Sequence, residues 1–144
     1  MGIKLYPADP AGTFADSMVY REDFKVQSDE KICTFHDVTE QTREIAARSG
    51  IRNGIAVVYS HHTTCCVITQ ECAFDQSVTG LETLQQDLVD ILDDIIPVCR
   101  HENIYLHPGP KALEFAEAHG EDARGCHNTD AHLRSSIIGR SETI

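Results

Sequence analysis

Residues 81–97, LETLQQDLVDILDDIIP, carry the clearest periodic pattern in the sequence. Leucine and isoleucine recur at helical spacing, which predicts an amphipathic helix with one apolar face. These apolar positions are Leu81, Leu84, Leu88, Ile91, Leu92 and Ile95. The helix is expected over 75–96, because Pro97 cannot continue it.

Several short segments around this helix predict strands. Residues 18–27 and 31–36 alternate between apolar and polar side chains, so we expect two antiparallel strands there. The β-branched run at 54–60 predicts a buried central strand, and 63–71 predicts another. Residues 141–144 have the character of the beginning of a strand.

Local signals mark three further helices. Asp37 and Glu40 form a capping-box pattern and Gly50 is a stop signal, which predicts a helix from about 38 to 49. Two shorter helices are expected over 111–119 and from Thr129 or Asp130 to Gly139. The combination predicts an α+β fold in which helices pack on a mixed or antiparallel sheet.

The composition bounds both the organisation and the partners. The chain has 144 residues, with 12 Lys and Arg against 23 Asp and Glu, giving a formal charge of −11. That length fits one domain over 18–144, preceded by an irregular arm at 1–17 and interrupted by a polar excursion at about 102–127. A surface this acidic argues against nucleic acid and anionic membranes as partners. No apolar run could span a membrane or serve as a leader, so we expect a cytoplasmic protein.

Cysteine and histidine are the residues that could carry chemistry. None of the six cysteines forms a CxxC pair, so neither a zinc ribbon nor a thioredoxin-type site is indicated. Seven of the eight histidines follow residue 60. His61 and His62 are adjacent, and on a strand they would face opposite ways, so they cannot chelate one ion together. The spacing alone leaves a structural role for them equally open.

Two acidic residues could join such a site. Along a straight strand His62 and Glu71 would lie roughly 30 Å apart on opposite faces. Either the chain bends at Thr63 and Thr64, or the two residues belong to different sites, or one site is shared between chains. Asp87 lies at the margin of the apolar helix face, where it could serve a site or pair with an arginine.

The later histidines differ in their setting. His107 and His119 lie in the polar excursion and are expected to be solvated, whereas His101 follows the end of the long helix. His132 falls in the first turn of the last predicted helix, where it could help to bind an anion or act as a zinc ligand.

Taken in order, several segments resemble the YjbQ-like family of secondary thiamine-phosphate synthases. They are Gly54–Val58, His62–Thr64, Gln70–Cys72, Asp87, His101, Asn128 with Ala131–Leu133, and Ile138–Ser141. The resemblance covers about 18–144. It implies a small α+β domain that forms a homotrimer, with a polar pocket containing His62, Thr63, Glu71, Asp87, His101 and His132.

The same resemblance implies a reaction. A pyrimidine pyrophosphate would lose diphosphate as the nitrogen of a thiazole phosphate takes its place, so the partner would be a small phosphorylated molecule. His62, Glu71 and Asp87 would be the catalytic residues, with Thr63, Thr64 and His132 binding substrate. A divalent metal, zinc or magnesium, would be held by His62, His101 and His132. The alternative is a trimer that binds a metal or small ligand without turnover.

The chain also departs from the family pattern. Cys65 and Cys66 replace the usual small residues, and Gln70 and Cys72 replace the amides that flank the family's glutamate. The family continues past the segment matched by 138–141 into a glycine-rich strand with a Trp-Gln pair, whereas this chain has no Trp. The resemblance therefore predicts either a truncated chain or neighbouring subunits that cover exposed sheet edges.

Overall fold

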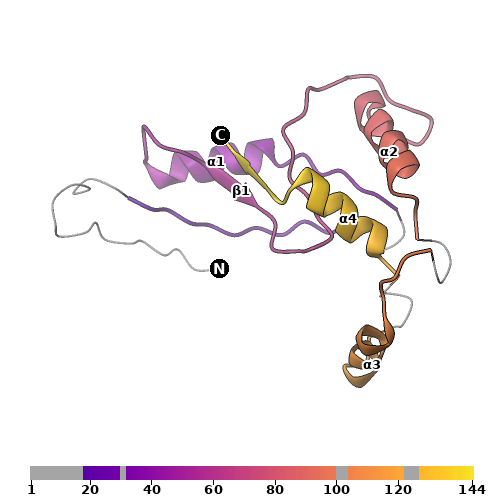
Figure 1. Ribbon diagram of the computed structural model, residues 1–144. Coiled ribbons are helices and arrows are strands. Elements are labelled where there is room, and N and C mark those ends of the chain that lie inside the picture. The colour runs from indigo at the N-terminus through magenta and orange to yellow at the C-terminus, as the bar shows by residue number, and fades with distance from the viewer. Residues whose placement is uncertain (1–17, 30–31, 100–103, 122–126) are drawn as a thin grey trace. The chain divides into compact units, whose positions relative to one another are not determined.

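A computed structural model of the chain describes residues 18–29, 32–99, 104–121 and 127–144. The chain divides into two compact units, residues 1–56 and 57–144, which we describe separately. The described part has four helices and a two-stranded antiparallel sheet, so the expected α+β class is confirmed (Figure 1). The arm expected at 1–17 lies outside the described residues. No helix in the described part is long and apolar enough to cross a membrane.

The first unit contains helix α1, Thr39–Ser49. Its bounds agree with the prediction of 38–49, and Gly50 ends it with φ of 70° and ψ of 0°. The N-cap is Val38, not the predicted Asp37, and it makes no side-chain cap hydrogen bond, whereas the Asp37 carboxylate accepts the Thr39 backbone N–H at 2.9 Å. Glu40 pairs with Arg43 instead of completing a capping box.

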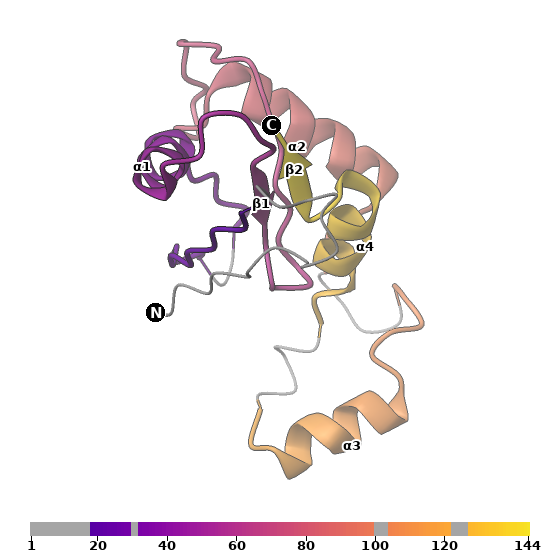
Figure 2. The same cartoon turned by 90° about the vertical axis from the view of Figure 1, so that its left-hand side faces the viewer.

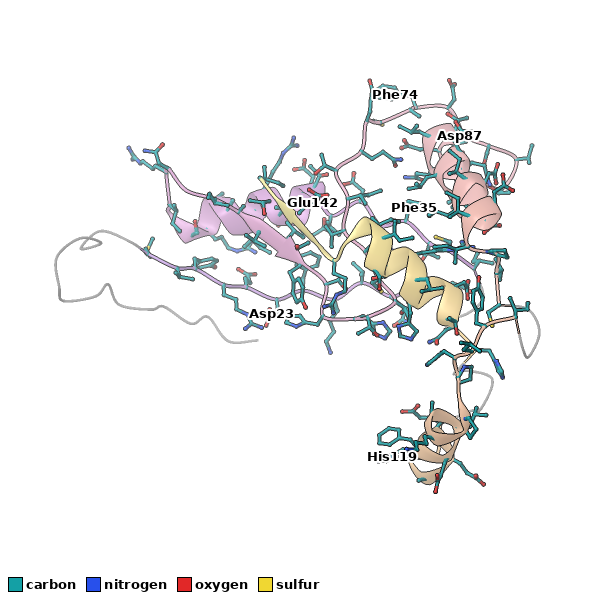
Figure 3. All side chains as sticks on the ribbon, in the orientation of Figure 1. Asp23, Phe35, Phe74, Asp87, His119 and Glu142 are labelled. Carbon is teal, nitrogen blue, oxygen red and sulfur yellow. The ribbon has the colours of Figure 1, made fainter. Side chains whose placement is uncertain are left out.

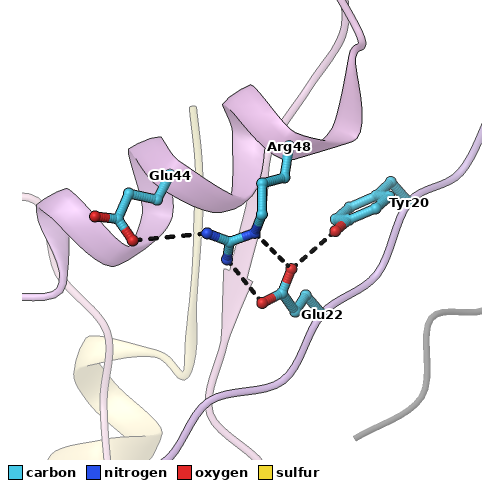
Figure 4. A network of polar contacts seen from close by, with 4 residues as sticks. All are labelled: Tyr20, Glu22, Glu44 and Arg48. Carbon is cyan, nitrogen blue, oxygen red and sulfur yellow. Dashed lines mark hydrogen bonds and ion pairs between the residues drawn. The ribbon is translucent and has the colours of Figure 1, made fainter.

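Polar contacts on the surface connect α1 to the segment before it (Figure 4). The Nη2 of Arg48 donates to Glu22 Oε1 at 2.7 Å, and the Tyr20 hydroxyl donates to Glu22 Oε2 at 2.8 Å. Glu44 lies 3.6 Å from Arg48 on the same helix face. The hydrogen bond from Arg48, reinforced by that from Tyr20, lowers the pKa of Glu22 below its usual value.

The two strands predicted at 18–27 and 31–36 do not form. Among the described residues of these ranges, the only ladder position is an isolated bridge at Val19. The polar side chains there contact their own neighbours, as in the pair of Arg21 with Asp23. An alternating pattern leads to a strand only where a partner strand can pair with its backbone. In this segment the side chains make contacts with their near neighbours instead.

The second unit contains the sheet. Strand β1, Val57–Tyr59, pairs antiparallel with β2, Ser141–Thr143, in the register Val58 opposite Glu142. The strand predicted at 141–144 is therefore confirmed, but β1 is shorter than expected and is not buried. Val57 is 62% exposed and Tyr59 47% exposed, because no second layer of described residues covers a sheet of two strands.

The strand predicted at 63–71 is also absent from this unit. The segment makes single hydrogen bonds instead of a ladder: the Val67 N–H donates to Gly139 O at 3.2 Å. Just before it, the Ser60 N–H donates to Arg140 O at 2.8 Å. Residues 60–67 thus make two backbone hydrogen bonds to residues 139–140 without forming a regular ladder. The turn at Thr63 and Thr64 interrupts the extended backbone between them.

The long helix predicted at 75–96 is the shorter α2, Thr83–Ile95. Its N-terminus is fixed by Glu82 and Gln85, which form a capping box. Glu82 Oε2 also accepts a hydrogen bond from the Ala73 backbone N–H at 2.9 Å, so the same carboxylate holds the preceding loop. The helix therefore begins eight residues later than the predicted start at 75, and it ends before Pro97 as predicted.

Two more helices complete the second unit. Helix α3 is Pro110–Ala118 and α4 is Thr129–Ile138, both close to their predicted ranges. In Figure 2, α4 continues directly into β2, which lies beside β1. Few residues of the described part are buried. The apolar ones are Ile96 and Ala116, and the polar ones are Thr129 and Ser135, both in α4.

Candidate functional site

The first turn of α4 holds a buried hydroxyl against a histidine. Thr129 is only 7% exposed, and its Oγ1 lies 2.8 Å from the carbonyl oxygen of His107 and 2.9 Å from His107 Nδ1. These two contacts attach the start of the polar excursion to the helix. His107 is exposed, as expected for the polar excursion, but it is also hydrogen-bonded to α4.

His107 also contacts the histidine that the sequence singled out in α4. The ring centroids of His107 and His132 are 5.7 Å apart, with their planes at 73°. His132 is partly buried one turn after Asn128, whose backbone carbonyl accepts its N–H. The structure thus places a pair of histidines beside the N-terminus of α4, and we take this pair as the candidate site.

An acidic group lies at the same helix end. Burial raises the pKa of the Cys99 thiol, and the charge of Asp130 raises it further, against a hydrogen bond from the Thr129 backbone. Burial and then Asp130 likewise raise the pKa of the Tyr105 hydroxyl. Asp130 therefore adds negative potential where the helix dipole supplies positive potential.

A buried hydrogen bond brings the His62 segment to the same helix. The Ser135 hydroxyl, 2% exposed, donates to the Cys65 carbonyl at 2.8 Å. Ser135 lies three positions after His132, which places the two on one side of α4. The segment that carries His62 is therefore attached about one helical turn from His132.

His62 itself is held by its own turn. Its Nδ1 lies 2.7 Å from Thr64 Oγ1 and accepts the Thr64 backbone N–H at 3.4 Å. The Ser60 hydroxyl accepts the His62 N–H at 3.2 Å. The chain does turn at Thr63 and Thr64. This is the bend that the first of the three alternatives for His62 and Glu71 requires.

The remaining predicted residues are not assembled with these histidines. Glu71 is exposed in the irregular segment, and Asp87 is exposed on α2 (Figure 3). Neither makes a hydrogen bond or ion pair with another described residue, so the arginine partner considered for Asp87 is absent there. Thr63 is exposed as well. His101 lies outside the described residues.

The arginine of α4 pairs with a different acid. Arg134 Nη2 donates to Asp93 Oδ1 and to the Ile96 carbonyl, each at 2.6 Å. Asp93 is still 42% exposed in this pair, whereas Arg134 is 13% exposed. Nothing in the sequence of α2 indicates that α4 would bring a cation to Asp93, because the two residues are 41 positions apart. The pair joins α4 to the C-terminal end of α2.

The metal-ligating residues of the described part do not form a complete site. No group of three or more His, Cys, Asp or Glu side chains in the described ranges could hold a metal ion. His107 and His132 can supply two nitrogens, whereas a structural zinc takes four ligands and a catalytic zinc takes three from protein. The rings of His107 and His132 can donate hydrogen bonds to a small polar ligand or accept them from it.

Comparison with known proteins gives the family of the chain. Residues 22–144 match the model of the family described as UPF0047 protein YjbQ-like. The chain belongs to this YjbQ-like family. It is 28% identical over 127 residues to a UPF0047 protein of Methanocaldococcus jannaschii, covering 88% of this chain and 70% of that protein.

A second archaeal relative agrees with this assignment. The chain is 25% identical over 126 residues to a UPF0047 protein of Methanothermobacter thermautotrophicus, covering 88% of this chain and 69% of the relative. No solved structure matches the chain. The matched region, residues 22–144, contains His107 and His132.

Proposed function

We propose that this YjbQ-like protein is a thiamine-phosphate synthase-type transferase that acts on a small phosphorylated pyrimidine. The observation that carries the proposal is the pairing of His107 with His132 beside the start of α4. Neutral imidazoles can serve such chemistry as hydrogen-bond donors or acceptors without a fixed charge. The resemblance of the His62–Thr64 segment to the family's histidine motif supports the same assignment.

The proposed reaction substitutes nitrogen for oxygen at one carbon. The bond between the pyrimidine methylene carbon and the diphosphate oxygen breaks, and the oxygen keeps the electron pair. The lone pair of the thiazole nitrogen forms the new bond to that carbon, which leaves a thiazolium cation. Charge therefore grows on the departing diphosphate, where preorganised N–H donors lower the barrier.

The described residues supply such donors in different places. The Nδ1 atom of His62 is held by Thr64, which leaves Nε2 as the ring nitrogen that can contact a ligand. His132 lies about one helical turn from Ser135, which binds the same segment at Cys65. We propose that both rings contact the diphosphate, with Thr63 as a neighbouring hydroxyl donor, while the Thr64 hydroxyl holds the His62 ring through Nδ1. Glu71 and Asp87 remain predicted catalytic residues. A divalent metal, zinc or magnesium, would add positive charge there, and of its predicted ligands His62 and His132 are described.

Oligomer and location form part of the same proposal. We propose a cytoplasmic homotrimer, for which the exposed side chains of β1 offer apolar surface, with Val57 and Tyr59 among them. Light scattering of the purified chain should give three times the mass of 16.0 kDa. A monomeric mass at micromolar concentration would contradict the trimer but not the reaction.

The reaction is tested directly with purified protein. Hydroxymethylpyrimidine diphosphate and thiazole phosphate should yield thiamine phosphate and diphosphate, measured by fluorescence of the oxidised product. His132→Ala should reduce the rate at least tenfold. His119→Ala is the matched control, because His119 lies at the end of α3 and stacks on Phe115. Equal rates for the two variants would remove His132 from the mechanism.

A specific observation favours a second candidate, a ligand-binding protein without turnover. The acid Asp130 lies in the first turn of α4, as His132 does, and acidic surroundings favour a bound cation over a departing anion. Titration calorimetry with zinc chloride, on protein purified without an affinity tag, separates the two. Stoichiometric zinc binding with no thiamine phosphate formed would favour binding alone.

A further inference from the structure

The buried hydroxyl of Thr129 makes two short contacts but has only one proton. Its Oγ1 lies 2.8 Å from His107 O and 2.9 Å from His107 Nδ1. The carbonyl oxygen is only an acceptor, so the hydroxyl proton must point to it for that contact to be a hydrogen bond. The proton in the other contact must then come from Nδ1. Any other arrangement leaves two acceptors facing each other at a buried position.

This proton count fixes the form of the His107 ring. With its proton on Nδ1, a neutral imidazole has a lone pair on Nε2. The free ring would carry its proton mainly on Nε2, so the Thr129 hydroxyl selects the less common form. His107 therefore presents an acceptor, and no other described residue is hydrogen-bonded to that Nε2.

His62 is in the opposite state. The Thr64 backbone N–H can only donate, so His62 Nδ1 must accept and the proton of the neutral ring sits on Nε2. Two threonines, each within reach of a histidine Nδ1, thus assign opposite roles to the two rings. His62 presents a donor and His107 presents an acceptor.

Other acceptors accompany His107 at the start of α4. The Oδ1 of Asn128, the residue next to Thr129, is buried and has no hydrogen-bond partner among the described residues. The carboxylate of Asp130 lies close enough to raise the pKa values of Cys99 and Tyr105. A helix N-terminus ordinarily attracts anions, but acceptors and an acid at this one favour a group that donates hydrogen bonds.

We propose that Thr129 is a positioning residue that holds His107 as the Nδ1–H tautomer, so that this end of the site receives a hydrogen-bond-donating group of the ligand. An aromatic amine, such as the amino group of an aminopyrimidine, has this chemistry. The choice of an aminopyrimidine rests on the proposed function, whereas the tautomer of His107 does not. The diphosphate of the same substrate would then lie toward the donor, His62.

The tautomer is measured by nitrogen NMR of the full chain at a pH where the rings are neutral. Long-range proton–nitrogen correlations should show His107 with a protonated Nδ1 and an unprotonated Nε2. Thr129→Val should move the proton to Nε2, and Thr129→Ser should keep the wild-type pattern. Thr64→Val is the matched control, because it changes a threonine beside His62 and should leave His107 as it was.

Three outcomes of this measurement are decisive. A proton on Nε2 of His107 in the wild type would overturn the assignment, and so would an unchanged Nδ1–H pattern in folded Thr129→Val. If circular dichroism shows that Thr129→Val does not fold, the wild-type and Thr129→Ser spectra decide the question. A merely structural threonine would not move the tautomer.

The ligand class is measured with two probes that differ in one group. Titration with 4-amino-2-methylpyrimidine and with 4-methoxy-2-methylpyrimidine should show at least tenfold tighter binding of the amine. Thr129→Val should reduce that preference to less than threefold. Equal binding of the probes, or binding of neither, would overturn the ligand class. Absence of thiamine phosphate formation with the amine preference intact would overturn the proposed function alone.

Discussion

Helices α1 and α4 are similar in length and both end at a glycine, yet they are stabilised differently. No residue of α1 is buried, and its contacts outside the helix are surface ion pairs such as Arg48 with Glu22. Helix α4 buries Thr129 and Ser135 and uses both in hydrogen bonds to distant segments. Surface ion pairs contribute little net stability, whereas buried hydrogen bonds are costly to break.

The comparison indicates where a functional site can be held. A site needs side chains that are held in place by buried contacts with other segments. Of these two helices, only α4 has such buried contacts. Its hydroxyls hold the His107 backbone and the segment that carries His62.

The largest effect is expected at Gly139, which ends α4, and it is compared with the matching change at Gly50, which ends α1. Gly139 has φ of 101° and ψ of 157°, a region that is essentially restricted to glycine, so Gly139→Ala should cost about 2–3 kcal/mol. Gly50 has the milder left-handed geometry, and Gly50→Ala should cost about 1 kcal/mol. A new Cβ would meet no atom within 4 Å at either site, so both costs are backbone strain. Hydrogen exchange of each helix measures them, and equal losses would contradict the ranking.

A smaller effect is expected at the buried serine of α4. Ser135→Ala removes the donor to Cys65 O and leaves that carbonyl without its partner, which should cost about 1–2 kcal/mol. Ser136→Ala is the matched control, because Ser136 is exposed and its hydroxyl only returns to the His132 carbonyl of the same helix. Denaturant melts of the two variants measure the difference. Indistinguishable midpoints would mean that α4 is not secured by this contact.

The smallest effect concerns the ion pairs of α1 and depends on pH. The pKa of Glu22 is lower in the folded chain than in the unfolded chain, chiefly because Arg48 hydrogen-bonds the carboxylate. Its contribution is therefore complete above the unfolded pKa of about 4.3 and is lost as the pH falls through the folded pKa. Protection of α1 amides should decline in that range for the wild type. Glu22→Gln should show a flatter profile, and parallel profiles would exclude the pair as the cause.

The sequence predicted those elements whose signals are local. Gly50 and Pro97 mark helix ends within a residue or two of where the structure has them, because the backbone geometry of these residues does not depend on distant partners. The strands at 18–27 and 63–71 were wrong for the opposite reason. A strand exists only through its ladder, and no pattern within these segments can show that the partner is missing.

The candidate site follows the same division. His132 was predicted because a histidine in the first turn of a helix has a recognisable local setting. His107 was missed because its contact with Thr129 spans 22 residues and depends on how the chain returns to α4. No local signal accompanies it in the sequence. The tautomers of His62 and His107 were likewise beyond prediction, since each is set by a single threonine proton.

The register of the sheet has a consequence for how the protein is made. Val57 pairs with Thr143, so the strand partners are 143 − 57 = 86 residues apart in the chain. At roughly 5–20 residues per second, a ribosome adds that length in roughly 4–17 s. During this interval β1 has left the ribosome without its partner, and its Val57 and Tyr59 edge is open to other chains. Pairing of the sheet can therefore only follow the synthesis of α4, which directly precedes β2 in the chain.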